Sequence, residues 1–176
     1  IYPTNGISLS ELMQRADIAL HKAKELGRNQ HVYFTDEMFI QTQQLIELNK
    51  NMVFALLNKE YELYYQPQVN IMTNEIIGAE ALIRWTREGK FIPPDKFIPV
   101  AEQTGFIVDL GCWILTSALK EKLIWEEADL DISMSINIAA RQFSEPDFFE
   151  NLKFYLDKFK VNRSQITLEI TEHIFL

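Results

Sequence analysis

Strand-like and helix-like segments alternate from residue 62 to residue 172, and this alternation limits the available folds more than any other feature. Runs of β-branched and aromatic residues predict strands at residues 62–69, 75–85, 131–139 and 165–172. Apolar residues at helical spacing predict helices at residues 95–104, 107–127 and 147–159. Such alternation is typical of α/β folds, so we expect a mainly parallel sheet with the helices outside it.

The first 58 residues are organised differently. Ser8 and Glu11 have the spacing of a capping box, which predicts a helix that ends at Gly27. A short strand is predicted at residues 31–34. A second helix, predicted at residues 36–58, is polar in its first half and has an apolar stripe too wide for a coiled-coil seam. We interpret it as a connector that docks at one end against a compact domain.

One face of the predicted strands is polar where a sheet covered by helices on both faces would be apolar. Strand alternation places Glu80 and Arg84 on the same face of the second strand. Gln66, Asn137 and Glu169 occupy polar positions of the first, third and fourth strands. Burying unpaired carboxylates is costly, so a metal ion, a cationic partner or solvent must compensate for them.

Two sheets fit this alternation equally well on spacing alone. One is a parallel barrel wall with a polar site, and the other is an antiparallel sheet with one face in water. The composition of the polar face favours a site, because it combines carboxylates, an amide and a single arginine. Carboxylate and amide oxygens suit Mg²⁺ or Mn²⁺, and an arginine suits a phosphate.

The overall charge and the cysteine content exclude several classes of protein. The formal net charge is −8, which disfavours binding to DNA or RNA. No uninterrupted apolar stretch reaches the roughly 20 residues needed to span a bilayer, so no membrane contact is expected in this segment. Cys112 is the single cysteine, which rules out an intrachain disulfide, and we expect it to pack as a small hydrophobic residue.

Five sequence blocks follow one another in the second part of the chain. They are Tyr65–Val69, Gly78–Trp85, Ile92–Gly105, Ser135–Phe143 and Leu168–Glu172. In order and content these blocks resemble EAL domains, and the resemblance extends over about residues 63–176. It implies a partial TIM-like (β/α)8 barrel of the EAL type.

The segments Ala16–Leu20 and Ala23–Asn29 resemble the C-terminal end of a GGDEF domain, a cyclase-like α/β domain. Lys24 and Arg28 lie one helical turn apart, and the resemblance implies contacts with nucleotide phosphates. A solvated basic pair near a helix C-terminus is the alternative. The implied division into GGDEF end, linker helix and first half of the EAL domain is residues 1–35, 36–58 and 59–176.

EAL domains hydrolyse cyclic-di-GMP to the linear dinucleotide pGpG with Mg²⁺ or Mn²⁺, by in-line attack of a metal-activated water. The resemblance implies that Glu80, Asn137 and Glu169 are metal ligands. It also implies that Gln66 and Arg84 contact cyclic-di-GMP, with Arg84 at a phosphate. Glu172 would position a downstream loop. The expected catalytic set is Glu80, Asn137, Glu169 and Glu172.

A complete barrel of this class takes roughly 250 residues, so the 176 residues are expected to form half of the site and to be inactive alone. The full-length protein is expected to be a bacterial cytoplasmic cyclic-di-GMP phosphodiesterase, by itself or as the cytoplasmic part of a larger sensor. Two alternatives stay open: a catalytically degenerate EAL domain that binds cyclic-di-GMP as a sensor, and an interaction module. The resemblance is compatible with a homodimer formed through the EAL domain.

Overall fold

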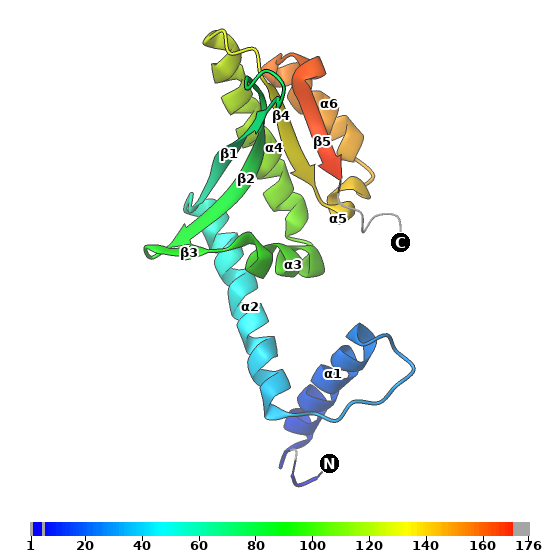
Figure 1. The fold of residues 1–176 in the computed structure, drawn as a ribbon. Coiled ribbons are helices and arrows are strands. Elements are labelled where there is room, and N and C mark those ends of the chain that lie inside the picture. Colours follow the sequence, from blue (N-terminus) through cyan, green and yellow to red (C-terminus); the bar gives the residue numbers. More distant parts are fainter. Residues whose placement is uncertain (1, 5, 171–176) are drawn as a thin grey trace. The chain divides into compact units, whose positions relative to one another are not determined.

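The computed structural model describes residues 2–4 and 6–170, and the chain forms two compact units. The first unit comprises residues 1–50 and the second comprises residues 51–176. The second unit contains all five strands of the described chain, drawn in Figure 1 in green to red. Within the described residues, no helix has both the length and the apolar character that crossing a membrane requires.

Helix α1 (Leu9–Glu25) of the first unit begins at the predicted capping box. The Ser8 hydroxyl accepts a hydrogen bond from the Glu11 amide at 3.2 Å, and the Glu11 carboxylate accepts one from the Ile7 amide at 3.1 Å. These bonds satisfy backbone donors that a helix start leaves without a partner. The helix ends two residues before Gly27, whose φ of 103° lies in the left-handed region that glycine favours.

The strand predicted at residues 31–34 is wrong. These residues are extended, but they form no strand ladder with any described part of the chain. A strand is defined by its hydrogen-bonded neighbour, and the sequence pattern gives only the extended backbone.

The predicted connector is a single helix, α2 (Asp36–Leu57). Within the second unit, its last turns bury Met52 and Ala55 completely. The Tyr61 hydroxyl donates a hydrogen bond to the Met52 carbonyl at 3.3 Å. The end of α2 is therefore fastened to the first strand that follows it.

The sheet is mixed. Its strands are β1 (Tyr61–Val69), β2 (Ile76–Arg87), β3 (Lys90–Ile92), β4 (Ser133–Ile138) and β5 (Ile166–Ile170). The order is β1-β2-β4-β5, with β3 also paired to β2. The pairs β2–β4 and β4–β5 are parallel, whereas β1–β2 and β2–β3 are antiparallel. The mainly parallel sheet expected from the alternation is thus wrong for β1, and the short strand β3 was not predicted.

The length of the connections explains the antiparallel pairs. Only residues 70–75 separate β1 from β2, and only residues 88–89 separate β2 from β3. A parallel crossover needs about a dozen residues or more, so neither connection can return the chain to the same end of the sheet. The parallel and the antiparallel arrangement that the sequence left open therefore both occur in this sheet. Strands β2, β4 and β5 are parallel, whereas β1 and β3 each pair with β2 in the antiparallel direction.

Helices cover one face of this sheet (Figure 1). They are α3 (Pro94–Thr104), α4 (Ile107–Glu127) and α6 (Phe148–Phe159). The short helix α5 (Ala140–Phe143) lies at the end of β4, and the 3₁₀ turn η1 (Arg163–Gln165) precedes β5. The bounds of α3, α4 and α6 agree with the predicted bounds to within one residue. The apolar positions of the strands pack beneath these helices, and Trp85, Phe97, Met134 and Ile136 are completely buried. Each such side chain contributes roughly 1.5–3 kcal/mol through removal from water.

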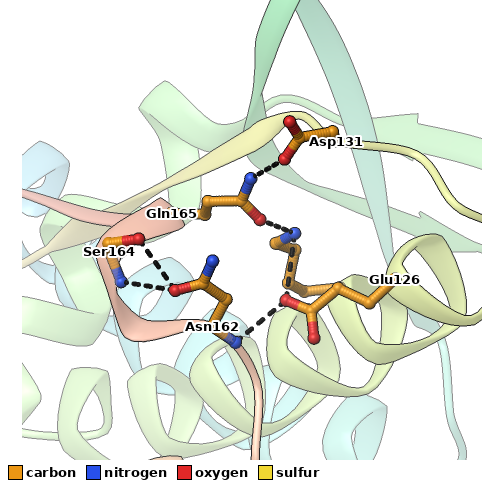
Figure 2. A network of polar contacts seen from close by, with 6 residues as sticks. Glu126, Asp131, Asn162, Ser164 and Gln165 are labelled. Atoms are coloured by element: carbon orange, nitrogen blue, oxygen red, sulfur yellow. Dashed lines mark hydrogen bonds and ion pairs between the residues drawn. The ribbon is translucent and has the colours of Figure 1, made fainter.

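A polar network fastens the starts of β4 and β5 to helix α4 (Figure 2). The completely buried Lys122 ammonium donates to the Gln165 side-chain oxygen at 2.6 Å and lies 3.1 Å from the Glu126 carboxylate. Glu126 also accepts a hydrogen bond from the Asn162 amide at 2.9 Å. The Gln165 side-chain nitrogen in turn donates to Asp131, which precedes β4. The lysine charge is therefore compensated within the protein, as a buried charge requires.

Candidate functional site

The polar positions of β1, β2 and β4 lie on one face of the sheet, opposite the helices. Gln66 is the direct cross-strand partner of Glu80, and Glu80 is the direct partner of Ser135. Directly opposed residues point to the same side of a sheet. The predicted shared face is therefore present for these strands.

Asn137 brings the three predicted metal ligands together. Its amide nitrogen donates a hydrogen bond of 2.6 Å to the Glu80 carboxylate on the neighbouring strand. Its partner in the parallel pairing with β5 is Glu169. Asn137 and Glu169 each stand one residue before the end of their strand. In barrels of parallel strands, the carboxyl ends of the strands carry the chemistry.

The donor atoms of this group suit a hard divalent cation. Glu80 and Glu169 are half-buried and Asn137 is exposed, so the oxygen atoms are not enclosed by the described chain. Two carboxylates and one amide oxygen are ligands that Mg²⁺ and Mn²⁺ accept. A cluster of three or more acidic, histidine or cysteine side chains, which would hold a cation by itself, does not occur among residues 2–4 and 6–170.

Arg84 lies on the same face but farther along β2. It stands four positions after Glu80, which corresponds to about 13 Å along a strand. Its guanidinium donates to the Ile83 carbonyl at 2.9 Å and lies 5.5 Å from the centre of the Tyr64 ring. Glu62 is its direct cross-strand partner, yet these two described side chains form no ion pair. The guanidinium is thus stacked on an aromatic ring rather than neutralised by a carboxylate.

Four other residues were singled out from the sequence: Lys24, Arg28, Cys112 and Glu172. Glu172 lies outside the described residues. Lys24 and Arg28 are both exposed, and Arg28 follows the end of α1 in a left-handed conformation with φ of 61°. Cys112 is half-buried, and burial raises the pKa of its thiol. A thiol that is more strongly protonated at neutral pH is a poor nucleophile, in agreement with a packing role.

Two neighbours of the site were not singled out from the sequence. Ser135 is almost fully buried between Glu80 and Thr167, and its hydroxyl accepts a hydrogen bond of 3.4 Å from Gln68. Tyr64 stacks on Arg84. Both residues occupy polar-face positions of their strands, so the alternation in the sequence already placed them on the face of the site. Their contacts depend on strand register, which a single strand does not reveal.

Comparison with known families and proteins identifies this unit. The family model described as "EAL domain" matches residues 49–176. The chain belongs to the EAL domain family. The matched residues include the last turns of α2 and the whole sheet, so Glu80, Asn137 and Glu169 all lie within the EAL domain.

Similar proteins match nearly the whole chain. The signaling protein YkoW of Bacillus subtilis is 39% identical over 98% of this chain, which spans 22% of YkoW. The bifunctional diguanylate cyclase/cyclic di-GMP phosphodiesterase MucR of Pseudomonas aeruginosa is 33% identical over 98% of this chain, which spans 25% of MucR. The chain therefore spans about a quarter of the length of these curated relatives.

A solved structure of an EAL enzyme is similar to this chain. The EAL enzyme Bd1971, determined with cAMP and cyclic-di-GMP bound, has a TM-score of 0.73 and is 30% identical. The match covers 97% of this chain and 46% of that chain. The mixed sheet and its covering helices are therefore those of an EAL-type fold.

Proposed function

We propose that the protein carrying this EAL domain hydrolyses cyclic-di-GMP to linear pGpG. The observation that carries this proposal is the direct contact between Glu80 and Asn137, with Glu169 in register beside Asn137, inside the segment that matches the family. MucR, which is named as a cyclic di-GMP phosphodiesterase, supports the substrate. A complete site needs a longer barrel wall than the four-strand path described, so the proposal concerns the full-length protein.

Glu80, Asn137 and Glu169 would hold a divalent cation, Mg²⁺ or Mn²⁺. The cation would supply a water of lowered pKa and positive charge beside the attacked phosphodiester. Asn137 directs its amide nitrogen at Glu80, whereas a cation binds the amide oxygen. Cation binding is therefore expected to turn the Asn137 amide by half a turn and to replace its hydrogen bond with Glu80.

Gln66 and Arg84 would hold the substrate. Gln66 lies beside Glu80, where its amide can donate to a ligand of the cation site. Arg84 keeps its positive charge without an ion pair to Glu62, so its planar fork suits a phosphate of cyclic-di-GMP. Glu172 would position a downstream loop. The implied catalytic set therefore remains Glu80, Asn137, Glu169 and Glu172.

The domain division is also a proposal. Residues 1–35 would be the C-terminal end of a GGDEF domain, residues 36–58 a linker helix, and residues 59–176 the first half of a TIM-like EAL barrel. MucR is named as both a diguanylate cyclase and a cyclic di-GMP phosphodiesterase, which supports a cyclase-like domain in the same protein. The protein would act in the bacterial cytoplasm, and its EAL domain could pair with a second copy.

The test is hydrolysis of cyclic-di-GMP by the full-length protein with Mg²⁺ or Mn²⁺, followed by chromatography of the linear product. Glu80→Gln should abolish turnover, because it removes a charged ligand while keeping the shape of the side chain. Glu75→Gln, an exposed carboxylate in the β1–β2 connection, serves as the matched control. Turnover that survives Glu80→Gln would refute the proposal. Tight binding of cyclic-di-GMP without turnover would favour the sensor alternative.

A further inference from the structure

Helix α5 follows β4 directly and contacts a distant corner of the chain. Arg141 of α5 donates hydrogen bonds to two carbonyls at the end of α3, that of Glu102 at 2.9 Å and that of Gln103 at 3.4 Å. The last carbonyls of a helix have no partner within the helix. The guanidinium therefore caps α3 from another segment of the chain.

Gly105, the residue that ends α3, makes room for this cap. Its φ of 89° lies in the left-handed region. A Cβ atom at this position would lie 2.9 Å from the Arg141 Nη2 atom and 3.2 Å from Cζ. The guanidinium thus occupies the space that a side chain at residue 105 would take.

The next residue, Gln142, repeats this arrangement on α4. Its side chain is buried to 4% exposure against Gly111, near the start of α4. A Cβ atom at residue 111 would lie 2.2 Å from the Gln142 side-chain oxygen. Two successive side chains of α5 are therefore each fitted to a glycine, one at the end of α3 and one near the start of α4.

The position of α5 connects this contact to the candidate site. Figure 1 shows α5 beside the ends of β4 and β5, close to the corner between α3 and α4. Asn137 precedes α5 by three residues, so no more than about 10 Å of chain separates them. Fixing α5 therefore limits how far the end of β4, and with it Asn137, can move.

We propose that Arg141 and Gln142 form a clamp that positions Asn137 for cation binding. The clamp joins two blocks of the sequence, Ile92–Gly105 and Ser135–Phe143, and only Asn137 of these blocks has a role in the proposed reaction. Arg141 and Gln142 act through Asn137 and touch neither substrate nor cation. The inference rests on the proposed cation site.

The test measures Mn²⁺ binding to the full-length protein by electron paramagnetic resonance, without substrate. Arg141→Gln should weaken Mn²⁺ binding on the order of 10-fold, since residues that orient metal ligands typically have this effect. Arg141→Lys keeps the charge but loses the fork that reaches two carbonyls, and it should have a smaller effect. Arg163→Gln, which changes an exposed arginine at the opposite end of the strands, should leave binding unchanged.

A double variant separates positioning from general destabilisation. In an Asn137→Ala background, Arg141→Gln should cause no further loss of Mn²⁺ affinity, because the residue it positions is absent. The clamp proposal would be overturned if the losses of Mn²⁺ affinity from Asn137→Ala and Arg141→Gln multiply in the double variant. Unchanged Mn²⁺ binding in the single variant Arg141→Gln would overturn it as well. Circular dichroism identifies any variant that fails to fold, in which case the comparison uses Arg141→Lys.

The same measurements distinguish the clamp from the proposed function. Wild-type protein that binds Mn²⁺ but does not hydrolyse cyclic-di-GMP would refute the phosphodiesterase assignment, and the Arg141 comparison would still decide on the clamp. Wild-type protein that binds no Mn²⁺ would overturn both the cation site and the clamp built on it.

Discussion

The close approach of Gln142 to Gly111 predicts that Gly111→Ala destabilises the wild-type protein but stabilises a variant that lacks the Gln142 side chain. Gly111→Ala places a Cβ 2.2 Å from the Gln142 side-chain oxygen, whereas ordinary contact begins at 3.4 Å. The buried glutamine must move by more than about 1 Å in a close-packed interior, and such overpacking costs roughly 1–3 kcal/mol. Alanine is also a better helix former than glycine by about 1 kcal/mol, which opposes this cost.

The clash should win, because Gln142 is almost completely buried and cannot swing into solvent. We expect Gly111→Ala to lower the free energy of unfolding by about 1 kcal/mol. In a Gln142→Ala background the clash disappears and only the helix preference remains. There, Gly111→Ala should raise the free energy of unfolding by about 1 kcal/mol.

The assay is urea denaturation of the four variants, followed by far-ultraviolet circular dichroism. The single substitutions, the double substitution and the wild type form a complete double-mutant cycle, which isolates the interaction between the two side chains. A Gly111→Ala variant that is stabilised in the wild-type background would refute the close approach of Gln142. Equal effects in both backgrounds would refute it as well.

Three further predictions concern other contacts. Tyr64→Ala should weaken binding of cyclic-di-GMP to the full-length protein about 3-fold, because it removes a cation–π contact with Arg84 worth roughly 0.5–1 kcal/mol. Tyr64→Phe keeps an aromatic ring and should bind normally. Equal affinities of the two variants in fluorescence titration would contradict this role of Tyr64. Lys122→Met should lower the free energy of unfolding in urea by about 2 kcal/mol, because Gln165 and Glu126 lose a charged donor; an unchanged midpoint would show that the network contributes nothing. Burial raises the pKa of Tyr61 and Tyr65 above the ordinary value of 10, so above pH 10 the folded state retains protons that the unfolded state loses. The free energy of unfolding should therefore decline as the pH rises above 10. Tyr61→Phe should flatten this decline when denaturation is measured as a function of pH.

Local chemistry made much of the fold predictable. The start of α1 depends on Ser8 and Glu11 alone, and these two residues form the predicted capping bonds. Alternation within each strand predicted polar positions for Glu80, Asn137 and Glu169, and the register between the strands then places the three residues on one face. Features decided within a few residues of the chain were therefore available from the sequence.

Features that depend on distant partners were not predictable in this way. The extended residues 31–34 lack a strand neighbour in the described chain, and the sequence pattern could not supply one. The antiparallel direction of β1 was available from the short connection 70–75, but the overall alternation outweighed it. The fit of Arg141 to Gly105 joins segments 36 positions apart, so neither residue alone indicates it.

The network around Lys122 has a consequence for any attempt to transplant this polar face into another protein. A slip of β4 by one residue would turn Asn137 toward the apolar layer, because neighbouring strand residues point to opposite faces. Lys122 of α4 holds Gln165, and Gln165 donates to Asp131 just before β4, so this chain of contacts opposes such slippage from the far end of the strands. The smallest portable piece is therefore not a set of strands but the strands together with the helix that anchors them.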